Sequence, residues 1–367
     1  MMLVEQYNAM HKENTHVDIE RYFNTKTLRR LRGKGLFCGM DYVGIEELRP
    51  VAFYSRLDHS MNVAYTASKL SDELEEVLAG AFHDVGTLSF SHVNSFKKRN
   101  GLKQDNDERN IKSILLEDEE TLTYLSEDGI NIDDVVDYSR YPLIDKEIPC
   151  MCLDRVEGVL ATCLFWAHTH TLDDIRGLYN MLCYIDKLDG LVFPLDNPRF
   201  KDFRGEMFLN EHFGDLDYED FFEAINVYSK KLLTKEDRYM MEILGCVLRY
   251  YEDMSVFDED DLFYLSEEEI INRILESPYK DIWRDVMSID KVFYDDANMH
   301  DLSFIVKPKI RQVNPLCMGQ MCLGEINDIS GNFYRELNDL KESIALLERP
   351  IAANLCDSTI KILRKYK

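Results

Sequence analysis

Two short stretches are the most informative part of the chain: RLDHS at residues 56–60 and HDVGTLSFSH at residues 83–92. Each lies within or directly after an apolar segment with helical spacing. A buried helix keeps imidazole and carboxylate side chains side by side only when a partner offsets their desolvation, and a divalent cation is a common partner. We therefore interpret His59, His83 and Asp84 as candidate metal ligands.

Residues 150–167 supply a third part of the candidate site. Their apolar side chains recur at helical spacing, and Asp154 lies beside that stripe on a narrow face that includes Gly158, so it is expected at a helix–helix contact. Three separate helices must then converge, which is how a helical bundle builds a metal centre in its interior. Two imidazoles and two carboxylates carry a charge of about −2, balance a divalent ion and leave coordination positions for water and a phosphate oxygen.

Arg56 lies three residues before His59, on the same face of the predicted helix. A planar guanidinium there is a candidate clamp for a phosphate group, and the alternative is an ordinary arginine in the first turn of a helix. With a metal ion beside it, this arrangement predicts phosphoryl chemistry, in which positive charge is placed where the phosphate charge develops.

Helical periodicity extends through most of the chain, so the predicted fold class is all-α, a mainly helical bundle. Helices are expected over residues 52–70, 73–85, 150–167, 218–252, 266–290 and 332–367, the last interrupted at Pro350. Residues 303–313 alternate enough to predict a strand or hairpin arm, which Pro308 confines to a sheet edge.

Glycine and proline residues break the pattern between residues 189 and 215, which predicts the main domain boundary. Residues 1–195 would form the catalytic core, with a polar helical lid over residues 101–145. Residues 196–367 would form a C-terminal helical region with the short strand element, packed on the core.

Composition narrows the function classes. The formal charge of −25, from 68 acidic and 43 basic residues, argues against a protein that grips long nucleic acid, whereas a small phosphorylated substrate remains compatible. No stretch of about 18 uncharged apolar residues and no signal pattern appears. The nine scattered cysteines are typical of a reducing compartment. We expect a cytoplasmic protein that does not bind a membrane.

At these residues the chain resembles the HD-domain metal-dependent phosphohydrolases, and within them the deoxynucleoside triphosphate triphosphohydrolase (dNTPase) branch. That branch typically shows R-x-x-H-S, H-D-x-G-H-x-P-F-x-H, an H-E pair and a helix opening with D-R-L-D-Y. The corresponding stretches here are residues 56–60, 83–92, 107–108 and 154–158. The resemblance spans roughly residues 20 to 315 and implies an HD-domain helical bundle that hydrolyses phosphate esters and assembles as a homo-oligomer.

The resemblance also implies the role of each site residue. It makes His59, His83, Asp84 and Asp154 the ligands of one divalent metal ion. Mn, Fe, Zn and Ni all fit imidazole and carboxylate ligands, and Mg also stays among the candidates. His92 corresponds to a family histidine that lines the phosphate pocket, where it donates a proton or contacts phosphate.

Several positions depart from the family pattern, among them Thr162, which replaces an aspartate near the sugar-packing tyrosine. Thr87 replaces the second histidine of H-D-x-G-H, and beside Arg56 and His92 it is a candidate substrate contact. Asp107 stands where the catalytic H-E pair has its histidine, so a carboxyl with a raised pKa would have to act as the acid. Gly158 takes the place of the tyrosine that packs on the sugar.

The sequence leaves alternatives open. The leading hypothesis is a phosphohydrolase that acts on a nucleotide or another small phosphate ester. The alternative is a catalytically weak, metal-binding HD protein that senses a nucleotide or regulates a partner, because Thr87 and Asp107 replace two family histidines. A nuclease is a third candidate, and the acidic charge opposes it.

Overall fold

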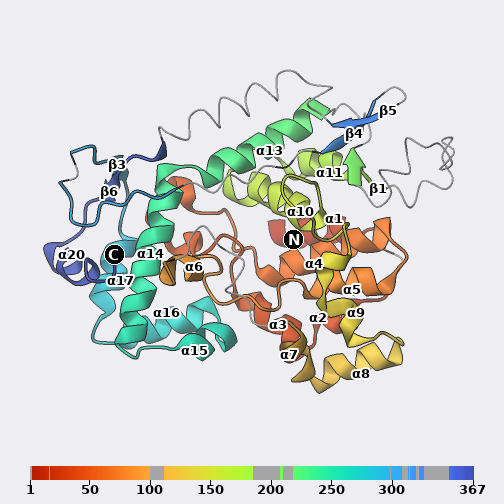
Figure 1. Ribbon diagram of the computed structural model, residues 1–367, viewed down its shortest axis with the longest axis horizontal. Helices are drawn as coiled ribbons and strands as arrows, with labels where there is room; N and C mark the ends of the chain where they lie inside the picture. Colours follow the sequence, from red (N-terminus) through yellow and green to blue (C-terminus); the bar gives the residue numbers. More distant parts are fainter. Residues whose placement is uncertain are drawn as a thin grey trace.

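A computed structural model of the chain describes residues 2–15, 17–99, 111–184, 207–209, 218–297, 299–307, 313, 315–319, 322–325 and 347–367. It is mainly helical, which confirms the predicted fold class (Figure 1). The helices of the first half are α1 (Leu3–Lys12), α2 (Glu20–Phe23), α3 (Lys26–Arg29), η1 (Arg30–Gly33), η2 (Met40–Tyr42), η3 (Glu46–Leu48), α4 (Arg56–Leu70), α5 (Leu74–Phe82), α6 (Val93–Lys97), α7 (Ile111–Leu116), α8 (Glu119–Glu127), α9 (Ile132–Val136), η5 (Tyr138–Arg140), α10 (Leu153–Ala161), η6 (Thr162–Trp166) and α11 (Leu172–Asn180).

The second half continues with helices and short strands. Its helices are α13 (Tyr218–Leu232), α14 (Lys235–Asp253), α15 (Glu259–Tyr264), α16 (Glu267–Glu276), α17 (Lys280–Met287) and α20 (Asp357–Leu363). The strands are β1 (Leu182–Tyr184), β2 (Met207–Leu209), β3 (Val292–Tyr294), β4 (Leu316–Gly319), β5 (Cys322–Glu325) and β6 (Ile351–Ala353).

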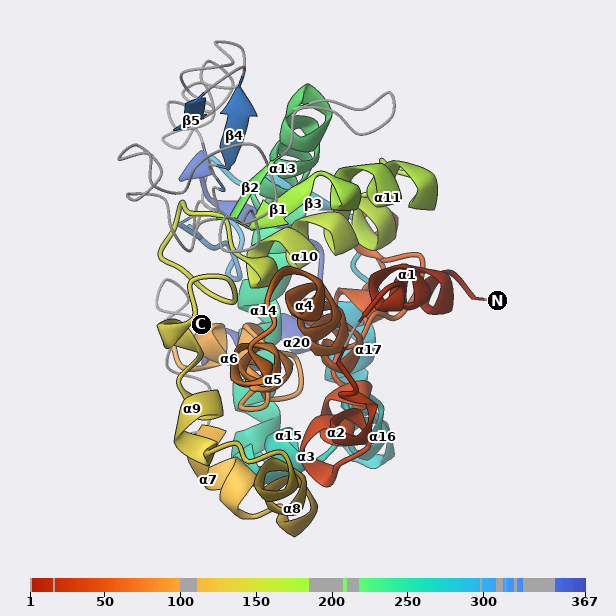
Figure 2. The ribbon, with the colours of Figure 1, turned by 90° about the vertical axis from the view of Figure 1, so that its right-hand side faces the viewer.

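Helix α4 is central to the first half and packs against α1, α5 and α10 (Figure 2). It begins at Arg56 because Ser55 caps it: the Ser55 hydroxyl accepts the Asp58 N–H at 3.1 Å, and the Asp58 carboxylate accepts the Ser55 N–H at 3.1 Å. Gly80 lets α5 approach α4 closely, because a Cβ there would lie 3.2 Å from Val63 Cγ1. The cap and this close approach set the start and position of the helix that carries Arg56 and His59.

The strands form two small sheets. One has the order β1-β2-β4-β5, in which β2 and β4 are parallel and the other neighbours antiparallel. The other pairs β3 with β6, with Phe293 opposite Ala352. Within the predicted strand at 303–313, Phe304 forms an isolated bridge with Ile351, and residues 308–312 lie outside the described residues.

The helix predicted over residues 332–367, interrupted at Pro350, is wrong directly after Pro350, and its residues 332–346 lie outside the described residues. Residues 351–353 form strand β6 directly after Pro350, and α20 begins only at Asp357. The Pro350 carbonyl accepts the Asp295 N–H at 2.8 Å, so this segment pairs across a sheet instead of along a helix. The predicted domain boundary at 195/196 and residues 101–110 of the predicted lid lie outside the described residues. Among the helices that the structure describes, none is long and apolar enough to cross a bilayer.

Candidate metal centre

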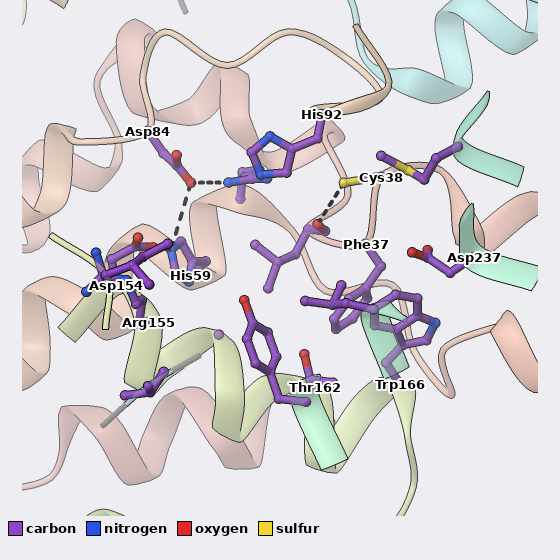
Figure 3. Close-up of a pocket in the computed structure, with 18 of the residues that line it drawn as sticks. Phe37, Cys38, His59, Asp84, His92, Asp154, Arg155, Thr162, Trp166 and Asp237 are labelled. Carbon is purple, nitrogen blue, oxygen red and sulfur yellow. Dashed lines mark hydrogen bonds and ion pairs between the residues drawn. The ribbon is translucent and has the colours of Figure 1, made fainter. Parts of the chain in front are cut away.

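Three ligand side chains from three helices meet at one point. Figure 3 shows two of them, His59 and Asp154, beside each other. His59 lies on α4, His83 directly follows α5, and Asp154 is in the first turn of α10. The two Nε2 atoms are 3.2 Å apart, and Asp154 Oδ1 lies 3.1 Å from His59 Nε2 and 3.6 Å from His83 Nε2. The convergence expected from the sequence is therefore present for these three residues.

The partners of the other ring nitrogens show that this donor set fits a metal ion. His83 Nδ1 lies 2.7 Å from the Gly80 carbonyl, and His59 Nδ1 is bonded to the Glu157 carboxylate. Both acceptors require an N–H, so in the neutral rings both Nε2 atoms present lone pairs to each other and to Asp154. A divalent cation satisfies two imidazole nitrogens and a carboxylate oxygen held this way.

Electrostatics among these groups is strong. Burial lowers the pKa of His59, but the carboxylates of Glu157 and Asp154 outweigh burial and raise it to about 10. Burial raises the pKa of Asp154, but the adjacent His59 and His83 rings, when they are protonated, hold it well below its usual range. The cluster therefore keeps its carboxylate ionised and attracts positive charge.

Asp84, the fourth predicted ligand, lies slightly farther away. Its Oδ2 is 3.8 Å from His59 Nε2 and 3.7 Å from His83 Nε2, and the same oxygen accepts a hydrogen bond from Arg56 Nη1 at 2.7 Å. Burial works against ionisation, but Arg56 outweighs it and lowers the pKa of Asp84. The other oxygen of Asp84 accepts a hydrogen bond from the Thr87 hydroxyl at 3.4 Å, so this hydroxyl faces Asp84. Thr87 is not among the residues that line the cavity next to the ligand cluster.

Arg56 is buried beside the ligands, with its side chain only 8% exposed. Besides its ion pair with Asp84, its Nε–H donates to the Ser91 hydroxyl at 3.2 Å. The phosphate-clamp role predicted for Arg56 remains a prediction, since the structure shows an arginine held beside the ligand cluster by two protein partners.

A cavity of about 460 Å³ opens from the ligand cluster. His92 and Arg56 line it, as predicted, whereas Asp107 lies outside the described residues. Asp154 and Asp237 line it on opposite sides in Figure 3, and Trp166 also lines it. A Cβ added to Gly158 would meet no atom within 4 Å, so the position that carries a tyrosine in the resembled family is open space here.

Glu157 is a further residue of the site that was not predicted from the sequence. Its carboxylate is buried, bonds His59 Nδ1, and accepts hydroxyl hydrogen bonds from Tyr54 at 2.5 Å and Tyr7 at 3.1 Å. A carboxylate behind a ligand histidine fixes the ring orientation and strengthens the ligand. One signal was available: Glu157 follows Asp154 by three residues and so shares its helix face.

Comparisons with known proteins agree with this geometry. Residues 56–143 match the model of the HD domain. The chain is 25% identical over 309 residues to the uncharacterized protein YdhJ of Bacillus subtilis (strain 168), covering 82% of this chain and 84% of that protein. A crystal structure of a phosphohydrolase from Bacteroides thetaiotaomicron matches the fold with a TM-score of 0.54 at 13% identity, covering 93% of this chain and 96% of the other.

These findings agree on one coarse assignment. The matched residues 56–143 include His59, His83 and Asp84. Asp154, from the following helix α10, completes a cluster that can hold a divalent metal. Residues 56–143 are therefore similar to an HD domain, and the candidate metal centre lies between this segment and α10.

Proposed function

We propose that this protein is a metal-dependent phosphohydrolase that acts on a nucleotide or another small phosphate ester. The observation that carries the proposal is the pair of imidazole Nε2 atoms, 3.2 Å apart and beside Asp154, at the wall of a cavity of about 460 Å³. Cavities of roughly 300–1,000 Å³ are typical of small-molecule sites. The site therefore combines a place for a divalent ion with room for a substrate.

His59, His83 and Asp154 would hold the ion, with Asp84 next to them. A divalent ion at such a site polarises a phosphoryl group and lowers the pKa of water. Glu157 fixes the orientation of the His59 ring and would keep its Nε2 available to hold the ion. Together these side chains supply ligands and orientation from three helices.

Arg56 and His92 would act on the substrate itself. The Arg56 guanidinium places fixed positive charge beside the cluster, where a phosphate group gains negative charge in the transition state. His92 lines the same cavity and is our candidate proton donor to the leaving oxygen. Asp107 is a further candidate acid on the evidence of the motif alone.

Among substrate classes we place nucleotides first, because the motifs resemble those of the dNTPase branch. The open space at Gly158 leaves room where the resembled enzymes have a sugar-packing tyrosine, so other sugars or phosphate esters also fit the proposal. The net charge of −25 disfavours long nucleic acid as substrate.

An activity screen tests the proposal. Purified protein with added Mn²⁺ is incubated with deoxynucleoside triphosphates, nucleoside monophosphates and cyclic dinucleotides, and the products are separated by anion-exchange chromatography. We expect turnover of at least one class that is lost in Asp154→Asn and retained in His170→Ala, whose imidazole does not belong to the ligand cluster. Tight binding without turnover would overturn the proposal in favour of a nucleotide-sensing protein.

A further inference from the structure

Glu267 is a fully buried carboxylate at the start of α16, away from the cavity. Its Oε1 atom accepts two backbone hydrogen bonds, from Gly35 N–H at 3.1 Å and from Phe90 N–H at 2.9 Å. Gly35 and Phe90 belong to segments far apart in the chain. One side-chain oxygen from the second half of the protein therefore ties together two segments of the first half.

The first of these segments sets the start of α4. Gly35 forms a bridge with Ser55, and the Arg56 N–H donates to the Lys34 carbonyl at 2.8 Å. A displacement of Gly35 would thus move the backbone of Arg56. The packing here is tight: a Cβ at Gly35 would lie 3.0 Å from Asp41 Oδ2 and 3.3 Å from Glu267 Oε2, so a larger residue would require these side chains to shift.

The second segment holds the Arg56 side chain. Phe90 and Ser91 have φ values of +63° and +45°, a region that residues other than glycine rarely adopt and that persists only when surrounding contacts enforce it. The bond from Phe90 to Glu267 is one such contact. The Ser91 hydroxyl accepts the Arg56 Nε–H at 3.2 Å and donates to the Gly35 carbonyl at 3.2 Å.

We infer that Glu267 is a positioning residue for Arg56: its carboxylate clamps the two backbone segments that fix the Arg56 main chain and guanidinium beside the metal centre. This inference rests on the proposed function for its catalytic meaning, since Arg56 is there the group that contacts phosphate. Glu267 does not line the cavity and bonds Gly35 and Phe90 rather than a predicted ligand, so its effect on the site is indirect and is expected to pass mainly through Arg56.

The surroundings of Glu267 fit a role beyond packing. Neither Glu267 Oε2 nor Asp41 Oδ2 has a hydrogen-bond partner within the described part of the chain. Burial and the nearby Asp41 raise the pKa of Glu267 to about 7, which makes the ionised carboxylate unfavourable for folding. Charged groups in such unfavourable settings are common where function needs them.

Orthophosphate binding to the Mn²⁺-loaded protein, measured by titration calorimetry, tests the inference without requiring turnover. We expect Glu267→Ala to weaken orthophosphate binding about tenfold, the loss of roughly one good hydrogen bond to a charged group, with Mn²⁺ affinity changed less than about threefold. Glu267→Gln keeps an acceptor for both N–H groups and should restore most of the affinity. Glu268→Ala, at the exposed neighbouring position, is the matched control.

A double-mutant cycle decides whether the effect passes through Arg56. If Glu267 acts by positioning Arg56, then Glu267→Ala has no further effect on orthophosphate binding in an Arg56→Ala background. Equal losses in both backgrounds, a parallel loss of Mn²⁺ affinity, or an unchanged affinity in Arg56→Ala would overturn the inference. Where Glu267→Ala fails to fold by circular dichroism, Ser91→Ala removes the next link of the same chain and is expected to weaken orthophosphate binding in the same way.

The proposed function and the role of Glu267 can fail independently of each other. If the wild-type protein hydrolyses no substrate class but the orthophosphate cycle gives the expected coupling, then Glu267 positions Arg56 in a binding protein. If a substrate is hydrolysed, then Glu267→Ala should raise KM or lower kcat while the metal content stays constant, and a fall in metal content instead would contradict the inference.

Discussion

The metal centre and the Glu267 cluster, which we define as Lys34, Asp41 and Glu267, are two groups of buried charges built in opposite ways. At the metal centre the side-chain donors face one another, with 3.1 to 3.6 Å between His59, His83 and Asp154. In the Glu267 cluster the side chains face the backbone: Glu267 accepts two N–H groups, and Lys34 Nζ donates to the Leu262 carbonyl at 2.9 Å.

The carboxyl groups of the two regions shift in opposite directions. The adjacent imidazole rings of His59 and His83, when they are protonated, hold the pKa of Asp154 well below its usual range. Burial raises the pKa values of Asp41 and Glu267 to about 7. The metal centre thus keeps an ionised carboxylate that can bind a cation. In the Glu267 cluster a carboxyl group binds backbone N–H groups, although burial disfavours the ionised form of that carboxyl group.

The largest expected effect is the loss of one ligand at the metal centre. His83→Ala removes one of three converging donors, so we expect Mn²⁺ affinity to fall at least about 1,000-fold, beyond the roughly 10- to 100-fold typical of outer-shell partners. Titration calorimetry on metal-free protein measures this, with His170→Ala as the control. Unchanged Mn²⁺ affinity in His83→Ala would show that the donors at the metal centre do not converge on a cation, and the contrast with the Glu267 cluster would then fail.

The second prediction concerns the pH dependence of stability in the Glu267 cluster. The pKa of Glu267 is raised from an ordinary 4.5 to about 7, so the folded state keeps its proton where the unfolded state has lost it. Its contribution to stability is present below about pH 4.5 and is lost as the pH rises to about 7, on the order of 3 kcal/mol in all.

Urea unfolding of the wild type and Glu267→Gln at pH 5 and pH 8 tests this. Because glutamine does not titrate, we expect the variant to lose less stability than the wild type between the two pH values. An identical loss in both proteins would contradict the raised pKa.

The third prediction concerns Glu157, the carboxylate that orients the ligand His59. Glu157→Gln keeps the shape of the side chain but weakens its bond to His59 Nδ1, so we expect Mn²⁺ affinity to fall about 10- to 100-fold. Tyr54→Phe removes one hydroxyl donor to Glu157 and should act in the same direction with a smaller effect. Unchanged affinity in Glu157→Gln would mean that the carboxylate does not tune the ligand.

The smallest expected effect contrasts the cavity wall with the packed core. Gly158→Ala places a methyl group in open space within α10, so we expect a gain of about 0.5–1 kcal/mol in stability. Gly80→Ala places the same group 3.0 Å from Ile144 Cδ1 and should destabilise the fold. Thermal unfolding measures both shifts: a destabilised Gly158→Ala would contradict the open space at Gly158, and a stabilised Gly80→Ala would contradict the tight packing at Gly80.

Much of the candidate centre could be predicted because its signals are local. The RLDHS and HDVGTLSFSH stretches and the helical spacing around Asp154 placed His59, His83 and Asp154 on apolar helices, and the structure brings these three together. Glu157 was missed because its carboxylate gains its meaning from His59, which lies 98 residues away in the chain. Strand β6 was missed because the pairing of Ile351–Ala353 with β3 outweighed the local helical pattern.

The sequence by itself determined the all-α class, the helix carrying Arg56 and His59, and the chemical type of each ligand, because periodicity and helix caps act over a few residues. Only the tertiary structure decided that Asp84 binds Arg56, that Thr87 faces Asp84, and that Glu267 reaches Phe90 across 177 residues. Such contacts join segments that meet only when the helices pack, and residue spacing along the chain carries no information about them.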